Sequence, residues 1–132
     1  MGLYNERARI LVVDDEPSLC RALSIAFTRH GYDVKAVESG EQALWLLRTE
    51  HFDCLVVDLR VPDLRGDILY ELGASLQPHL KQSTVFTTGD SSELALDLIG
   101  ACGCPVVAKP FDLAELIAVV DGMTRGRGEA RA

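Results

Sequence analysis

The sequence predicts an α/β protein whose doubly wound parallel sheet of five strands carries helices on both faces. Five short strand-like runs alternate along the chain with five segments of helical periodicity. Most of the runs are apolar without alternation, as expected for strands covered on both faces. Strands that alternate with helices form parallel sheets through right-handed crossovers. The length of 132 residues suits one such domain with one core.

The first half of the chain shows the strand–helix pattern twice. Residues 9–13 are predicted to form an apolar strand, and Pro17 suits the first turn of the helix that follows. Residues 33–37 form a second, more polar strand. Ser39 and Gln42 have the spacing of a capping box, which predicts the start of the second helix.

The second half of the chain continues the pattern with three strands and three helices. The predicted strands cover residues 52–57, 83–87 and 104–108. The predicted helices cover residues 66–76, residues 91–99 and the segment after residue 112. Asp112 and Glu115 are spaced to cap the last helix, and Phe111 and Leu116 are spaced for a hydrophobic staple.

The predicted domain has short extensions at both ends. Residues 1–8 are polar and are expected to be a flexible lead-in to the domain at residues 9–124. Residues 125–132 are small, charged and rich in glycine, so a disordered tail is expected there.

Four predicted strands end on side chains that suit a phosphoryl or metal site. These are Asp14 and Asp15 after the first strand, Asp58 after the third, Thr88 after the fourth and Lys109 after the fifth. In an open parallel sheet, ligands bind beyond the carboxyl ends of the strands, where the strand order reverses. The second strand ends on no reactive group, so the order 2-1-3-4-5 is the most economical. Adjacent strands lie ~4.8 Å apart, so the three aspartates would converge within reach of one ion.

The three carboxylates would repel one another unless a cation joined them. Oxygen ligands suit Mg²⁺, which would neutralise charge near Asp58 and hold an incoming phosphoryl group in line. Asp58 could then act as a nucleophile and form an acyl phosphate. Thr88 offers a hydroxyl, and Lys109 a positive charge, to the phosphoryl oxygens. Gly89 would leave space for that group to enter.

Each of these residues also has a purely structural interpretation when it is considered alone. An Asp–Asp pair before a helix often caps it, and an aspartate at a strand end often begins a turn. A threonine in a strand is common, and a Lys–Pro sequence is common in solvated loops. Their joint occurrence at four strand ends favours a site over coincidence.

Four motifs carry a resemblance to a known family. They are Val12-Val13-Asp14-Asp15-Glu16-Pro17, Val57-Asp58, Thr88-Gly89 and Lys109-Pro110-Phe111. In this order and spacing they resemble the receiver domain of two-component response regulators, over about residues 8–124. The resemblance implies a flavodoxin-like (βα)5 fold.

The resemblance also implies a role for each site residue. Asp58 would be the phospho-acceptor, and Asp15 and Asp58 would bind Mg²⁺ directly. Asp14 would bind the ion through a water, and the backbone carbonyl of Arg60 would complete the protein ligands. Thr88 and Lys109 would be the switch hydroxyl and the phosphate-pairing lysine. The bond between Lys109 and Pro110 would be a cis peptide.

The chain departs from the family pattern in places that affect the switch and the lifetime of the phosphoryl group. Val106 stands where many receivers carry an aromatic residue that turns inward on activation, so an aromatic switch is not expected. Residues 100–105 are more similar to receivers attached to hybrid sensor kinases. Arg60 and Asp90 flank the site, and we hypothesise that they pair across its mouth and hinder the hydrolytic water. Two independent solvated charges are the alternative.

The resemblance implies a histidine kinase or a histidine phosphotransfer protein as the phosphoryl donor. The output partner is unknown, a homodimer is possible, and the face formed by the fourth helix, fifth strand and fifth helix would shift on phosphorylation. Catalysis would be limited to self-phosphorylation and slow self-dephosphorylation. The formal charge of −7 disfavours direct nucleic-acid binding. No apolar run could span a membrane and no signal peptide is visible, so the cytoplasm is the expected location.

Three alternative functions remain open. A Mg²⁺-dependent phosphohydrolase with an aspartyl nucleophile usually has a second acid two residues after the nucleophile, where this chain has Arg60. A flavodoxin-like cofactor binder would need a phosphate loop after the first strand, where this chain has three acidic residues. A protein-binding module with little phosphorylation fits the same sequence.

Overall fold

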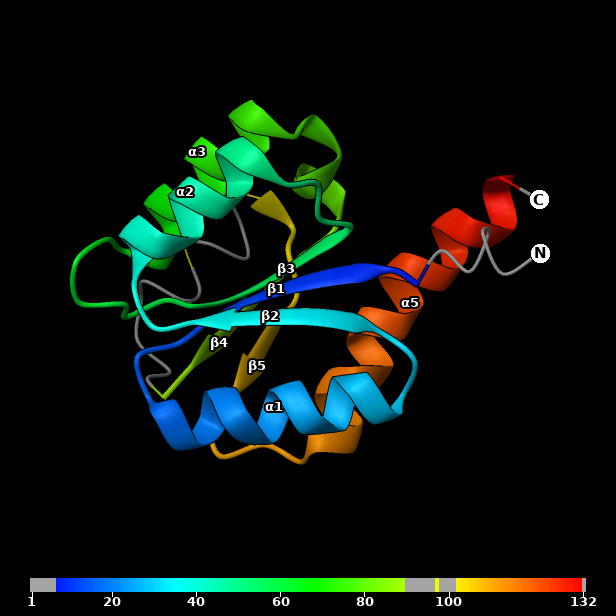
Figure 1. The fold of residues 1–132 in the computed structure, drawn as a ribbon, viewed down its shortest axis with the longest axis horizontal. Helices are drawn as coiled ribbons and strands as arrows, with labels where there is room; N and C mark the ends of the chain where they lie inside the picture. Colours follow the sequence, from blue (N-terminus) through cyan, green and yellow to red (C-terminus); the bar gives the residue numbers. More distant parts are fainter. Residues whose placement is uncertain (1–6, 90–96, 98–101, 132) are drawn as a thin grey trace.

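The computed structural model describes residues 7–89, 97 and 102–131. A central parallel sheet lies between two layers of helices, with α2 and α3 on one face and α1 and α5 on the other (Figure 1). Within these described ranges, no helix is both long enough and apolar enough to cross a membrane.

The sheet confirms the predicted strand order. Its strands are β1 (Arg9–Val13), β2 (Asp33–Val37), β3 (Cys54–Asp58), β4 (Thr84–Thr88) and β5 (Val106–Ala108). They are all parallel and lie in the order β2-β1-β3-β4-β5. Val13 pairs with Val57, Asp58 with Thr87, and Thr88 with Ala108. This register brings the carboxyl ends of β1, β3, β4 and β5 to one edge of the sheet.

The helices follow the predicted alternation. They are α1 (Pro17–Arg29), α2 (Gly40–Thr49), α3 (Gly66–Leu76) and α5 (Leu113–Arg131), with a short 3₁₀ helix, η2, at Pro78–Gln82. The helix predicted over residues 91–99 falls outside the described residues, apart from Asp97. Both Phe111 and Leu116, the predicted staple pair, contribute to the core between the sheet and the α1–α5 layer.

Helix α2 has two caps rather than the single capping box that the sequence predicts. The Ser39 hydroxyl accepts a hydrogen bond from the Gln42 N–H at 3.1 Å, as expected. The Gln42 side chain bonds the N–H of Glu38 at 3.2 Å, and a capping box would use the N–H of Ser39. The second cap comes from a distant loop, because the Asp63 carboxylate accepts from the N–H groups of Gly40 and Glu41 at 2.8 and 3.0 Å.

Strand β4 begins one residue later than predicted, at Thr84, and β3 and β5 begin two residues later, because the N–H groups of their predicted first residues have other hydrogen-bond partners. The N–H of Phe52 donates to the Gln77 side chain at 3.0 Å, so β3 begins only at Cys54. Strand β5 begins at Val106 rather than residue 104, since Pro105 has no N–H to donate. The N–H of Cys104 points instead to the Cys102 sulfur at 3.2 Å.

Helix α5 extends to Arg131 and includes residues 125–131, where the composition predicts a disordered tail. This stretch contains arginine, glutamate and alanine, which are good helix formers, together with two glycines, which are not. Extending an existing helix adds one hydrogen bond for each residue that is fixed, which is far easier than nucleating a new helix. The backbone therefore continues as a helix where composition alone suggests disorder.

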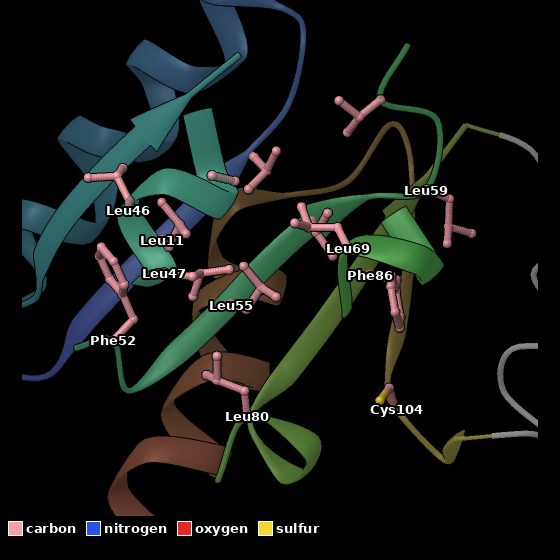
Figure 2. Close-up of a cluster of buried hydrophobic side chains, with 14 residues drawn as sticks. Leu11, Leu46, Leu47, Phe52, Leu55, Leu59, Leu69, Leu80, Phe86 and Cys104 are labelled. Carbon is pink, nitrogen blue, oxygen red and sulfur yellow. The ribbon is translucent and has the colours of Figure 1, made fainter. Parts of the chain in front are cut away.

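The core has two halves, one on each face of the sheet. Leu11, Leu55 and Phe86 face the α2–α3 layer and form the cluster drawn in Figure 2. Ile10 and Val56 face the α1–α5 layer. Because both sheet faces are covered, the central strands β1, β3 and β4 are buried at nearly every position, and β1 and β3 are almost entirely apolar.

Candidate functional site

The strand ends gather the predicted polar groups at one edge of the sheet. Asp14 follows β1, Asp58 ends β3, Thr88 ends β4 and Lys109 follows β5. The residues at three of these positions are almost fully buried, with exposures of 2% for Asp14, 6% for Asp58 and 3% for Thr88. Ionisable groups are seldom buried unless they are paired or bind an ion. The burial of these side chains therefore predicts that they are paired with one another or bind an ion.

Lys109 joins the carboxylates of two different strands. Its Nζ atom lies 2.7 Å from Oδ2 of Asp14 and 2.8 Å from Oδ2 of Asp58. Burial opposes the charge of the ammonium group, but the hydrogen bonds to the two aspartates outweigh burial and raise the pKa of Lys109. The lysine is therefore a fixed positive charge at neutral pH.

Glu16 also contacts the lysine, although sequence reasoning did not assign it to the site. Its Oε1 atom lies 3.2 Å from Lys109 Nζ, and its side chain is 58% exposed. The available signal was its position directly after Asp14-Asp15. A contact this exposed contributes only about 0–1 kcal/mol.

Burial and hydrogen bonding act in opposite directions on the pKa of Asp14. Burial raises the pKa of its carboxyl group, and the hydrogen bonds from Lys109 and from the N–H of Glu16 oppose that rise. The Glu16 N–H donates to Asp14 Oδ1 at 2.9 Å, so both carboxylate oxygens have a donor. The negative charges of Asp14, Asp15 and Asp58 exceed the single positive charge of Lys109, which favours an added cation.

Asp58 is held at both of its carboxylate oxygens. Oδ1 accepts a hydrogen bond from the backbone N–H of Arg60 at 3.0 Å, and Oδ2 contacts Lys109. The backbone beside it is fixed to the next strand, because the Leu59 N–H donates to the carbonyl of Thr87 at 3.0 Å. The carboxylate is thus oriented before any ligand arrives.

Gly66 is a further residue that sequence reasoning missed. A Cβ atom at this position would lie 2.5 Å from the carbonyl oxygen of Asp58 and 2.9 Å from Cα of Leu59. Only glycine allows the first residue of α3 to approach the backbone of Asp58 so closely. No signal in the sequence separates this glycine from an ordinary helix-start glycine.

The three aspartates fit a hard divalent cation. Asp14, Asp15 and Asp58 each offer a carboxylate oxygen, and these oxygens lie within 4.8 Å of one another. Oxygen donors at this spacing suit Mg²⁺, which takes one or two protein carboxylates and keeps several waters. Asp14 and Asp58 are buried while Asp15 is exposed, so the cluster opens towards solvent.

The remaining predicted residues are only partly placed by the structure. A Cβ added at Gly89 would meet no atom within 4 Å, so the fold itself does not require glycine there. Val106 is half-buried and packs against the core on the α2–α3 side. The Lys109–Pro110 peptide bond is cis. Asp90 lies outside the described residues, so its pairing with Arg60 stays a prediction.

A family model described as the response regulator receiver domain matches residues 10–121 of this chain. The chain therefore belongs to the response regulator receiver domain family. The match begins in β1 and ends in α5, so it spans every strand and all the polar groups of the site described above.

Curated relatives include a DNA-binding response regulator and a probable transcriptional regulatory protein. The chain is 35% identical over 120 residues to the DNA-binding response regulator MtrA of Mycolicibacterium smegmatis, covering 90% of this chain and 51% of MtrA. It is 32% identical over 120 residues to the probable transcriptional regulatory protein TcrX of Mycobacterium tuberculosis, covering 90% of this chain and 50% of TcrX. The chain thus spans about half the length of these two relatives.

Solved receiver structures share the fold. A response regulator receiver protein from Sinorhizobium medicae superimposes with a TM-score of 0.82 at 27% identity, covering 92% of this chain and 98% of that one. A CheY-like receiver domain protein from Methanospirillum hungatei gives 0.86 at 22% identity, covering 95% and 99%. A Burkholderia pseudomallei response regulator with a phosphorylated aspartic acid, calcium ion and citrate gives 0.77 at 25% identity, covering 95% and 73%.

Proposed function

We propose that this domain accepts a phosphoryl group on Asp58 from a histidine kinase or a histidine phosphotransfer protein. The observation that carries the proposal is the buried Asp58 carboxylate at the end of β3, which contacts Lys109 and lies beside Asp14 and Asp15. Membership of the receiver family agrees with a role in signal transduction through a phosphorylated aspartate.

The arrangement suits attack by a carboxylate oxygen on phosphorus. A bond forms between that oxygen and phosphorus while the phosphorus–nitrogen bond to the donor histidine breaks. The imidazole, already protonated on its other ring nitrogen, leaves as a neutral group. The Arg60 N–H and Lys109 orient the Asp58 carboxylate before the step. Once the phosphoryl group is attached, the Lys109 ammonium group can pair with one phosphoryl oxygen. The Thr88 hydroxyl can donate a hydrogen bond to another.

Asp14, Asp15 and Asp58 are the residues that would hold Mg²⁺, with Asp15 and Asp58 as direct ligands, Asp14 acting through a water and the Arg60 carbonyl completing the set. When bound, the ion supplies positive charge that offsets the carboxylates and the incoming phosphoryl oxygens. The Burkholderia pseudomallei relative supports this reading, because its structure contains both a phosphorylated aspartic acid and a divalent cation.

Receiver domains are not enzymes in the usual sense, and we propose that this one catalyses only its own phosphorylation and slow dephosphorylation. The phosphohydrolase alternative is not favoured, since the second acid that such enzymes use is replaced by Arg60. We further propose that phosphorylation shifts the face that includes β5 and α5 and so changes binding to an output partner. Half-buried Val106 has little bulk to turn inward, so the shift would not depend on an aromatic side chain.

Intact-mass measurement after incubation with a small phosphodonor tests this proposal. Wild type is expected to gain one phosphoryl group in the presence of Mg²⁺ and none after chelation. Asp58→Asn is expected to gain none under either condition. A wild type that binds Mg²⁺ in a separate titration but gains nothing would favour the protein-binding module.

A further inference from the structure

Most of the exposed large apolar side chains of the described residues lie on α2 and α3. Among the described residues, the exposed large hydrophobic side chains are Ile25, Trp45, Ile68, Leu72 and Leu76. All except Ile25 lie on these two helices, which pack side by side on one face of the sheet (Figure 1). Trp45 is the most exposed of them, at 61%. Tryptophan is enriched among the residues that dominate binding at protein interfaces.

Trp45 stands beside an open groove of about 610 Å³. The floor of the groove carries the partly buried Val37 of edge strand β2 and the buried Leu46 of α2. Its rim carries the exposed side chains of Glu41 and Arg48. A protruding indole and an apolar hollow therefore lie next to each other on one surface, with an acid and a base beside them.

The charges on this surface are self-complementary. Glu41 lies four residues before Trp45, and Arg48 lies three residues after it. A two-fold axis that crosses α2 between residues 44 and 45 would place Glu41 of one copy opposite Arg48 of a second copy, and the reverse. The same rotation would bring Trp45 of each copy to the level of residue 44 of the other, between Gln42 and Leu46, which line the groove. A symmetric dimer interface has this property, because the same patch must fit itself.

We propose that two copies of this chain associate through α2 in antiparallel orientation. Trp45 of each copy packs into the groove of the other, and Glu41–Arg48 ion pairs close both ends of the contact. The interface uses one helix and the strand beside it, so it falls in the small, weak class and forms only at high concentration. This contact is separate from the phosphoryl site, and it does not depend on the function proposed for Asp58.

The fluorescence of Trp45 can report association directly, because Trp45 is the only tryptophan in the chain. Sedimentation equilibrium from about 1 µM to about 1 mM is expected to show a monomer–dimer equilibrium. The tryptophan emission is expected to shift to shorter wavelength along the same concentration curve. Trp45→Ala is expected to weaken association at least about tenfold. Ile25→Ala, which removes an exposed apolar side chain on α1, is the matched control and leaves association unchanged.

Charge exchange makes the test specific for the antiparallel pairing. Glu41→Lys alone or Arg48→Glu alone places like charges at both ends of the dimer and weakens it. An equimolar mixture of the two variants restores association, since each end then pairs a base with an acid. A wild-type protein that stays monomeric over the whole concentration range overturns the proposal. A dimer that Trp45→Ala does not weaken, or a mixture no tighter than either variant, also overturns it.

Discussion

The Nζ atom of Lys109 lies 2.8 Å from Oδ2 of Asp58, although the two residues are 51 positions apart in the chain. The parallel register of β3, β4 and β5 brings them together, and Asp14 completes the bridge from β1 at 2.7 Å. A partly buried cation shared by two carboxylates stabilises the site and places a positive charge where an incoming phosphoryl group would bind. Predictions about stability and about chemistry both follow from this contact.

Replacement of Lys109 by methionine leaves Asp14 and Asp58 buried without their cation. We expect the free energy of unfolding at pH 7 to fall by about 3 kcal/mol. Lys109 opposes the burial-driven rise in the Asp14 pKa, so its removal raises that pKa further. Protonation of Asp14 then relieves the repulsion as the pH falls. The stability deficit of the variant therefore shrinks as the pH is lowered, which urea unfolding at pH 7 and at pH 5 can measure.

The exposed Lys81 provides a control for the loss of a lysine. Lys81→Met is expected to change the unfolding free energy by less than about 0.5 kcal/mol at both pH values. A Lys109→Met variant as stable as wild type at pH 7 would show that the bridge contributes nothing to the fold.

Gly66 is predicted to be intolerant of any side chain. The added methyl group in Gly66→Ala would lie 2.5 Å from the Asp58 carbonyl oxygen, so the backbone beneath the acceptor must move. We expect a loss of about 1–3 kcal/mol in chemical denaturation and slower phosphorylation by a small phosphodonor. Gly122→Ala is the matched control in α5, where a new Cβ would meet no atom within 4 Å. It should be neutral or slightly stabilising.

Asp63 is predicted to make the stability of α2 depend on pH. Hydrogen bonds from the N–H groups of Gly40 and Glu41 lower the pKa of its carboxyl group. A lowered folded-state pKa means that the contribution is complete above the unfolded pKa of 3.8 and is lost as the pH falls through the lower folded value. The difference in melting temperature between wild type and Asp63→Asn should therefore narrow below about pH 4. A constant difference from pH 6 to pH 3 would contradict this role.

Arg60 is predicted to prolong the lifetime of the phosphoryl group. If it pairs with Asp90 across the mouth of the site, Arg60→Ala should admit the hydrolytic water more readily. Exposed ion pairs contribute about 0–1 kcal/mol, so the dephosphorylation rate constant should rise by no more than about fivefold. Asp90→Ala should have the same effect, while Arg65→Ala, in the same loop, should have none. An unchanged rate in Arg60→Ala would refute the pairing hypothesis.

The sheet order and the convergence of Asp14, Asp58 and Lys109 could be predicted from sequence because strand ends carry a simple signal. An apolar run followed by a reactive side chain marks both the strand and the edge at which it ends. The length of each strand was harder to predict. Hydrogen bonding of Phe52 to a side chain and the missing N–H of Pro105 shorten β3 and β5, although their apolar runs continue.

The contacts that sequence reasoning missed all depend on loop geometry. Asp63 caps a helix whose first residue is 23 positions away, and Gly66 is required only because α3 begins against the Asp58 carbonyl. The Glu16–Lys109 contact joins two loops across the sheet. None of these pairs has a local pattern, because each is created by the way that the loops fold back over the strand ends.

Chemical mapping of the phosphorylated residue tests the central claim most directly. Borohydride reduces an aspartyl phosphate to homoserine, so peptide mass analysis after reduction identifies the acceptor. We predict homoserine at position 58 alone, only after incubation with phosphodonor and Mg²⁺, and none in Asp58→Asn. Homoserine at position 14 or 15, or a phosphorylated protein without homoserine at position 58, would contradict the assignment of Asp58 as the acceptor.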